Sequence, residues 1–237
     1  MTSRPKKHAA GAKHSRARTA DPKNAVLAAA LAHAAFDGFT DAVLTRAGDE
    51  AGVSRSELRR LFPQGPLSLV EAFSEWADAQ MIRELAKLKL ASMKIRERIG
   101  RAVDARVTVL RPHKEAARRA AAFLTLPPHA PMGVKLLYRT VDSIWRAIGD
   151  TSTDFNFYTK RAILAGVYST TLMRWFSDGT ANETETSEFL RRRIDDVMKF
   201  EKFKAQVRER MGALPSLADI LNPDRRDAAP RSKATGA

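Results

Sequence analysis

The sequence predicts an all-helical fold, and three observations support that prediction. Residues that cap helix N-termini, such as Asp21, Thr40 and Ser54, each precede a segment with apolar residues at helical spacing. Pro and Gly residues, among them Pro112 and Gly149, separate the later segments. Strand signals do not recur along the chain. At 44% hydrophobic residues over 237 positions, the chain can bury a substantial core.

The predicted helices follow one another with short breaks. Pro22 occupies the first position of the first helix, where a missing N–H is tolerated, and Gly38 ends that helix. Thr40 caps the second helix, and Gly52 stops it by supplying a left-handed turn residue. The whole series is expected over residues 22–38, 41–51, 55–62, 66–90, 94–111, 113–125, 132–148, 154–176 and 184–200.

The third helix completes a helix-turn-helix pattern. Ser54 and Glu57 form a capping box in front of it, and the turn at residues 51–54 separates it from the second helix. The run at residues 58–63 resembles the recognition helix of TetR-family repressors. A DNA-binding head is therefore one interpretation of the N-terminal region.

Two departures from the repressor pattern weigh against sequence-specific DNA binding. Arg59 stands where those repressors usually place a phosphate-contacting Tyr, and Gly65-Pro66 replaces the Lys that opens their fourth helix. Arg59 and Arg60 can neutralise phosphates, but that gives only non-specific affinity. We expect the helix-turn-helix to act mainly as a folding unit, with weak DNA contact and true operator reading as alternatives.

The longer helices carry wide apolar faces. Pro66 opens the fourth helix, which places Val70 and Phe73 at core-facing spacing. The helix expected over residues 132–148 has one broad apolar face, and the helix expected over 154–176 is apolar nearly all round. A helix of the second kind must be surrounded by core, by a partner subunit or by a bound apolar ligand.

The charge of the chain is strongly positive and uneven. The formal net charge is +14, and residues 1–23 hold seven Lys or Arg against one acid. Residues 198–237 hold nine Lys or Arg against five acids. This balance favours anionic partners, either nucleic acid or phospholipid head groups. The longest apolar run, residues 25–36, is much shorter than the ~20 residues that a spanning helix needs.

No constellation of residues indicates catalysis or metal binding. The chain has no cysteine, which excludes disulfides, thiolate metal sites and cysteine nucleophiles. The five histidines show no metal-ligand spacing, and neither a glycine-rich phosphate loop nor a nucleophile elbow is present. We therefore expect no catalytic residue, no metal and no resident cofactor.

The segment around residues 136–178 resembles a known family. Trp145, Gly149-Asp150, the Ser-Thr-Asp-Phe-Asn run at 152–156, and Tyr158-Thr159 match the hallmark of the coenzyme Q (ubiquinone) biosynthesis lipid-binding accessory family. The resemblance extends over roughly residues 22–200. It implies a TetR-like helical bundle without catalytic residues, which forms a homodimer and binds isoprenoid lipids. It also implies a partner, the di-iron hydroxylase that acts on demethoxyubiquinone.

The resemblance and the helical pattern together assign two sets of residues. A pocket for an isoprenoid quinone precursor or a phospholipid is expected to be lined by Trp76, Leu137, Val141, Trp145, Phe155, Ile163, Val167 and Tyr168. The surface that faces the hydroxylase is expected to include Ile144, Asp154, Phe157 and Tyr158. Core packing is the alternative explanation for each aromatic residue, and it fits the Phe157-Tyr158 pair least well.

The C-terminal region has the pattern of a helix that lies in the membrane surface. Apolar residues fall within roughly 80° of one another at ~100° per residue, and basic residues flank them. The residues expected to contact membrane lipids are Phe200, Phe203, Lys204, Val207, Arg210, Met211 and Leu214. Docking of this helix on the body of the protein or on a dimer partner is the alternative.

These observations divide the chain into five parts. We expect a disordered basic tail (1–20), a helix-turn-helix-like head (21–65), a lipid-binding and dimerisation body (66–198), an amphipathic membrane-interacting helix (199–221) and a disordered tail (222–237). A cleaved presequence is the alternative for the first part. The resulting hypothesis is a lipid-binding accessory protein of ubiquinone biosynthesis, cytoplasmic and peripheral on a bacterial inner membrane. The alternative is a TetR-type regulator with an apolar effector.

Overall fold

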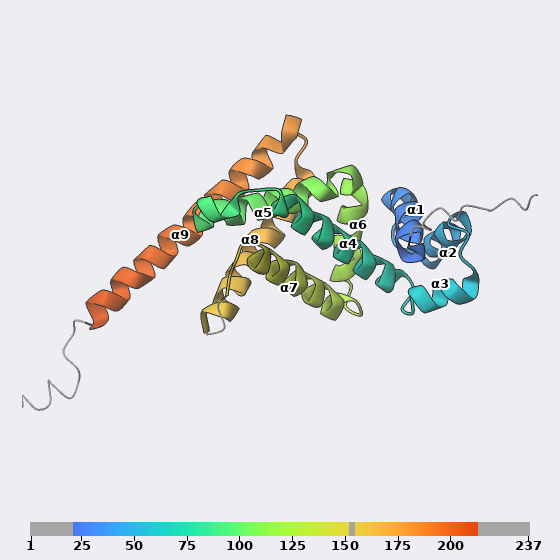
Figure 1. Cartoon of the computed structure of the whole chain (residues 1–237), viewed down its shortest axis with the longest axis horizontal. Coiled ribbons are helices and arrows are strands. Elements are labelled where there is room, and N and C mark those ends of the chain that lie inside the picture. The colour runs from blue at the N-terminus through green and yellow to red at the C-terminus, as the bar shows by residue number, and fades with distance from the viewer. Residues whose placement is uncertain (1–20, 152–154, 213–237) are drawn as a thin grey trace, which may run out of the picture.

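A computed structural model describes residues 21–151 and 155–212, with side chains described for 21–151 and 157–199. Every regular element in these ranges is helical, which confirms the predicted all-α fold (Figure 1). Three short 3-10 turns, Leu90–Ser92, Arg111–His113 and Ala181–Glu183, join some of the helices. The helices are α1 (Pro22–Asp37), α2 (Asp41–Glu50), α3 (Arg55–Leu61), α4 (Pro66–Ala86), α5 (Ile95–Leu110), α6 (Lys114–Thr125), α7 (Ala130–Ala147), α8 (Phe155–Ser177) and α9 (Thr184–Gly212).

The head, α1 to α3, begins its helices at the predicted residues. The Asp21 carboxylate accepts the backbone N–H of Lys23 at 3.2 Å, and the Thr40 hydroxyl accepts that of Val43 at 3.2 Å. The Ser54 hydroxyl accepts the N–H of Glu57 at 3.3 Å. Each cap satisfies a backbone donor that the first turn of a helix leaves without a partner. The predicted N-terminal caps of all three helices are confirmed.

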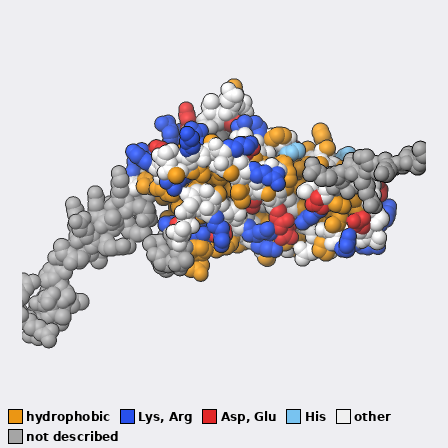
Figure 2. Space-filling model, viewed as in Figure 1, with side chains coloured by type: hydrophobic (Ala, Val, Ile, Leu, Met, Phe, Trp, Pro, Cys, Tyr) orange, Lys and Arg blue, Asp and Glu red, His pale blue; other side chains and the backbone are white. Residues whose placement is uncertain are grey.

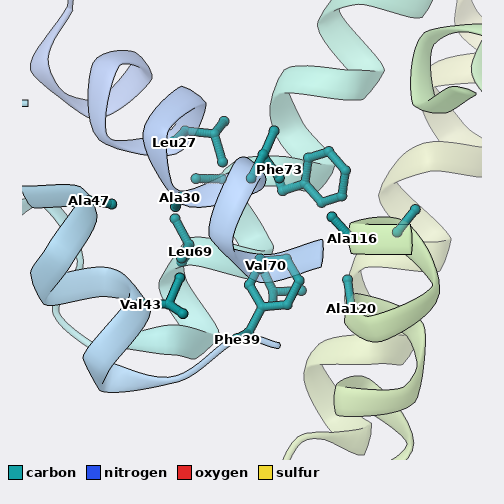
Figure 3. Packing of buried hydrophobic residues seen from close by; sticks show 14 of the residues in the cluster. Leu27, Ala30, Phe39, Val43, Ala47, Leu69, Val70, Phe73, Ala116 and Ala120 are labelled. Carbon is teal, nitrogen blue, oxygen red and sulfur yellow. The ribbon is translucent and has the colours of Figure 1, made fainter. Parts of the chain in front are cut away.

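One apolar core joins the head to the body. Leu27 and Ala30 of α1, and Val43 and Ala47 of α2, pack against the first half of α4 (Figure 3). Ala116 and Ala120 of α6 belong to the same cluster, and the Phe39 ring stacks on Phe73 with 6.3 Å between centroids. The helix α4 runs out of the head and into the body (Figure 1). The head therefore shares its core with the body and does not form a separate unit.

A second apolar core lies in the body alone. It includes Met81 and Leu85 of α4, Val103 of α5, Ile144 of α7 and Leu190 of α9. Leu172 of α8 contacts both clusters. Because α8 packs against α7 and α9, Leu164, Val167 and Tyr168 are buried, but Tyr158 and Met173 are exposed, so α8 is covered only in part and not all round as its sequence suggests.

Most helix ends lie within two residues of the sequence expectation, and two boundaries differ by more. The helix α4 ends at Ala86 and not near residue 90, where a 3-10 turn follows. The helix α9 runs from Thr184 to Gly212 without a break, so the amphipathic segment expected to begin at residue 199 continues α9. The side chains of Phe200, Phe203, Lys204, Val207, Arg210 and Met211, together with Leu214 and the two tails, lie outside the described residues. Among the described helices, none combines the length and apolar character needed to span a bilayer.

Charged groups are mixed over the surface. On the face shown in Figure 2, Lys and Arg side chains lie among acidic and apolar ones and do not form one continuous stripe. Several pairs bridge neighbouring helices: Arg139 of α7 contacts Glu71 at 3.2 Å and Glu75 at 2.8 Å on α4. Exposed pairs of this kind contribute little to stability, because water and salt screen them.

Candidate lipid-binding site

The body contains an apolar cavity of about 430 Å³ between α4, α5, α6, α7 and α8. Its walls are mostly hydrocarbon, and the lining residues include Val70, Phe73, Leu110, Ala120, Leu137 and Leu172. Small-molecule pockets in proteins usually measure about 300–1,000 Å³ and are lined by apolar side chains with a few polar groups. We call this space the first cavity.

The first cavity is open at one end of α7 and closed at the other. Along α7 the exposed fraction of the lining side chains falls from 69% at Val134 to 2% at Thr140. The lining residues of α7 run from Ala130 to Thr140. Ten residues of α-helix rise about 15 Å, so the cavity extends for a comparable length. A linear hydrocarbon suits this shape.

A charged pair lies at the closed end. Arg106 is 3% exposed and Asp78 is 8% exposed. The Arg106 Nε donates to Asp78 Oδ1 at 2.9 Å, and Nη2 donates to the Ser74 carbonyl at 3.4 Å. The Thr140 hydroxyl lies 2.9 Å from Asp78 Oδ1 and 3.1 Å from Oδ2. Burial raises the pKa of Asp78, and the charge of Arg106 opposes that rise.

A second cavity of about 240 Å³ lies between α5, α7, α8 and α9. Its lining includes Ile99, Trp145, Ile163, Val167 and Val197. The Trp145 indole is nearly buried, and its Nε1 donates to the Lys160 carbonyl at 3.3 Å. Lys160 Nζ lies over the Trp145 ring, 5.5 Å from the centroid. The ring of Trp145 is thus fixed by contacts with α8.

The structure divides the predicted lipid-binding residues between the two cavities. Leu137 and Tyr168 line the first cavity, and Trp145, Ile163 and Val167 line the second. Val141, one turn from both Leu137 and Trp145 on α7, is buried in the second core and lines neither cavity. The single hollow expected from the sequence is therefore two spaces, with α7 and α8 bordering both.

Two predicted lipid-binding residues remain. Trp76 lines neither cavity; its ring stacks on Phe73 at 6.1 Å and meets the edge of His113 at 5.6 Å. That position makes Trp76 part of the wall between α4 and the turn before α6. The side chain of Phe155 lies outside the described residues.

A buried arginine organises the junction between α7 and α8. The Arg161 side chain is 4% exposed, and its Nε donates to Asp142 Oδ1 at 2.8 Å. Its Nη1 lies 3.4 Å from Asp150 Oδ2 and 3.2 Å from the Phe157 carbonyl. The guanidinium carbon also lies 3.4 Å from the centroid of the Phe157 ring. Lys160 Nζ donates to Asp150 Oδ1 at 3.0 Å, which adds a second link.

The residues predicted to face a partner protein differ in exposure. Tyr158 is 67% exposed, and its ring meets Phe157 edge-on with 5.1 Å between centroids. Phe157 is half-buried and held by Arg161. Ile144 is completely buried in the second core, so its predicted place on a partner-facing surface is wrong. Asp154 lies outside the described residues.

The sequence analysis did not identify the buried charges Arg106, Asp78 and Arg161. A signal for Arg106 exists, since it follows Val103 by three residues and therefore lies on the apolar face of α5. A charged residue in such a stripe indicates a buried ion pair. Within the described residues, no cluster of three or more His, Asp or Glu side chains could hold a metal ion.

Comparison with known proteins places these features in a family context. Residues 130–201 match the sequence model of the COQ9 family. The chain is 32% identical to "Ubiquinone biosynthesis protein COQ9, mitochondrial" of Bos taurus over 196 residues, which is 80% of this chain and 61% of that protein. For the Homo sapiens protein of the same name, identity is 31%, again over 80% of this chain and 61% of the relative. The chain thus spans about three fifths of the length of these curated relatives.

The fold has a structural neighbour as well. A crystal structure of a TetR transcriptional regulator from Nitrosomonas europaea superposes with a TM-score of 0.61. The match covers 74% of this chain and 97% of the regulator, at 22% sequence identity. The chain therefore has the predicted TetR-like fold, and at this identity the likeness concerns the fold alone.

Proposed function

Because this chain is a homologue of the ubiquinone biosynthesis protein COQ9, with the COQ9 family segment at residues 130–201, we propose that it is a non-catalytic lipid-binding accessory protein of ubiquinone biosynthesis. In this role it takes an isoprenoid quinone intermediate from the membrane and presents it to the di-iron demethoxyubiquinone hydroxylase. The ligand would lie in the body, and the head would serve as a folding unit.

The first cavity is the observation that carries the proposal. Each CH₂ group moved out of water is worth about 0.8 kcal/mol, so a polyprenyl tail leaves a bilayer only for an equally apolar surface. The walls from Val70 to Leu172 offer such a surface over about 430 Å³. The cavity opens toward Val134, which gives a tail an entry path.

The surface beside the α7–α8 junction supports the partner role. Tyr158 is an exposed aromatic residue, and Arg161 fixes the neighbouring Phe157 through ring and carbonyl contacts. Aromatic anchors held in one conformation are frequent at the centre of protein interfaces. We expect the hydroxylase to contact this surface. Homodimer formation and membrane contact through the end of α9 belong to the same proposal.

The proposal is tested by identifying the bound lipid. The full chain is purified under conditions that retain lipid, and the extract is analysed by mass spectrometry for isoprenoid quinones and phospholipids. Ala121→Phe fills the first cavity, whereas Ala122→Phe places the same side chain on the exposed face of α6. We expect at least about a ten-fold loss of bound lipid for the first variant only, equivalent to ~1.4 kcal/mol. Protein that carries no lipid, or equal loss in both variants, contradicts the proposal.

A further inference from the structure

The first cavity has a polar end whose hydrogen bonding is incomplete. Arg106 lines this cavity, and its Nη1 has no hydrogen-bond partner among the described residues. A buried donor without an acceptor costs about 1–3 kcal/mol, and more when the group is charged. Native structures rarely leave such a group without a partner unless a ligand or an ordered water supplies one. A ligand oxygen at the closed end of the cavity that Arg106 lines is one source of that acceptor.

The other polar groups of this end limit what that acceptor can be. Asp78 already accepts from Arg106 and Thr140, so the pair carries no net charge when both groups are ionised. A second carboxylate or a phosphate beside Arg106 would also lie close to Asp78 in a medium of low polarity, where like charges repel strongly. An uncharged oxygen avoids that repulsion and still accepts a charge-assisted hydrogen bond.

Tyr168 offers a second donor at the same end. Its side chain is 5% exposed, lines the first cavity and makes no hydrogen bond with a described residue. Burial raises the pKa of Tyr168, while the charges of Arg106 and Asp78 act on that pKa with opposite signs. The phenol therefore stays protonated at neutral pH and can donate to a ligand oxygen.

We propose that Arg106, oriented by Asp78 and Thr140, is the head-group site of the first cavity and binds an uncharged oxygen, such as a quinone or phenol-ring oxygen, of an isoprenoid lipid. The ring enters first and rests against Arg106 and Tyr168, and the tail extends along α7 toward Val134. The inference rests on the proposed lipid-binding function and adds to it the orientation of the ligand and the class of its head group.

Three probes with alkyl tails of nine or ten carbons separate this inference from simple apolar binding. The full chain is titrated by calorimetry with a decyl-substituted benzoquinone, with decylbenzene and with decanoic acid. One charge-assisted hydrogen bond is worth about 1.5–3 kcal/mol, so the quinone is expected to bind at least about ten-fold more tightly than decylbenzene. Decanoic acid at pH 7.5 is expected to bind more weakly than the quinone.

A paired substitution tests the residues. Asp78→Asn together with Arg106→Gln removes both charges and keeps an amide pair at the closed end. In this double variant we expect the preference for the quinone over decylbenzene to disappear, with decylbenzene affinity retained within about three-fold. Arg101→Gln, on the exposed face of α5, is the matched control and should keep the preference.

Each outcome decides between the possibilities. Equal affinity of the intact chain for quinone and decylbenzene overturns the head-group site and leaves apolar lipid binding intact. Tightest binding of decanoic acid also overturns it, because the site would then be one for anions. Failure of all three probes to bind removes the proposed function together with this inference. If the double variant does not fold, the comparison of quinone with decylbenzene on the intact chain still tests the head-group site.

Discussion

The head and the body are both helical, but they differ in the charges that they bury and in the hollows between their helices. Within residues 21–65 no described polar or charged side chain is buried, and local caps begin all three helices. The body buries two arginines: Arg106 pairs with Asp78, and Arg161 pairs with Asp142 and Asp150. It also contains two apolar cavities. The head is thus packed without buried charge, and its hollow beside Leu58 has a mixed polar and apolar lining, whereas the body has apolar hollows and a buried charge at one of them.

The difference matters because neither feature of the body improves stability. A cavity forfeits the contacts that side chains would otherwise make, and a buried ion pair is often no better than apolar residues of the same volume. Both features fit a binding role more readily than a folding role. The following predictions test this comparison, from the largest expected effect to the smallest.

Loss of the Arg161 guanidinium should have the largest effect. Arg161→Met leaves Asp142 and Asp150 without their buried partner, and breaking such a pair costs about 3–5 kcal/mol. Arg60→Met in the head is the matched change, since Arg60 is exposed and, among the described residues, pairs only with Glu57; it should cost below about 1 kcal/mol. Urea unfolding followed by circular dichroism measures both. Equal costs would remove the contrast between the two regions.

Truncation of one leucine in each region should distinguish the buried core of the head from the half-buried wall of the first cavity. Leu58 is buried in the head, where its side chain lies 2.8 Å from the position of a Cβ added to Gly48, so this contact is tight. Leu58→Ala should cost about 2–5 kcal/mol. Leu137→Ala should cost less, about 1–2 kcal/mol, because this side chain is only half-buried and so removes less apolar surface from water than Leu58 does. The same urea titration measures the loss of unfolding free energy in both variants. A larger loss for Leu137→Ala than for Leu58→Ala would contradict this prediction.

Acid should weaken the start of α9 through Asp178. The hydroxyls and backbone N–H groups of Thr180 and Thr186 donate to this carboxylate and hold its pKa well below the usual value. A carboxyl with a lowered pKa in the folded state stabilises the protein above its unfolded pKa of about 3.9, and that stabilisation is lost as the pH falls further. Asp178→Asn should therefore be less stable than the unsubstituted chain at pH 7.

The pH dependence of that difference is the test. Unfolding free energies of the two proteins should converge between about pH 4 and pH 2, since protonation removes the advantage of the carboxylate in the unsubstituted chain. Glu115→Gln, at a partly exposed residue that pairs with Arg118 on α6, is the control and should show a smaller pH dependence. A constant difference across this range would assign another role to Asp178.

The smallest effect is expected on the surface of α3. Arg59 is exposed, so Arg59→Gln should change the unfolding free energy by less than about 0.5 kcal/mol. Fluorescence anisotropy with two unrelated DNA duplexes should show weak binding that is equal for both and is lost at physiological salt. Tight binding of one duplex that survives this salt would instead support a regulator with an apolar effector.

The fold could be predicted from the sequence because its signals are local. Asp21, Thr40 and Ser54 cap helices through neighbouring residues, and those contacts need no knowledge of the rest of the chain. The continuation of α9 past residue 199 was missed because the basic amphipathic pattern of residues 200–214 was interpreted as a separate helix, whereas the backbone continues without a break to Gly212. Helix existence was therefore more predictable than helix boundaries.

The site was less predictable because it depends on contacts between distant residues. Leu137 and Trp145 share a face of α7, which suggested one pocket, yet the packing of α5 and α9 assigns them to different cavities. Arg106 and Asp78 lie 28 positions apart, and only the packing of α4 against α5 brings them together. Helical periodicity identifies which residues point inward but not which of them border empty space.

The placement of adjacent residues on α8 has one further consequence. Val167 borders the second cavity and Tyr168 borders the first, so a single rigid rod forms a partition between two chambers. If α8 shifts as a rigid helix, a ligand that displaces it from one cavity also changes the width of the other cavity.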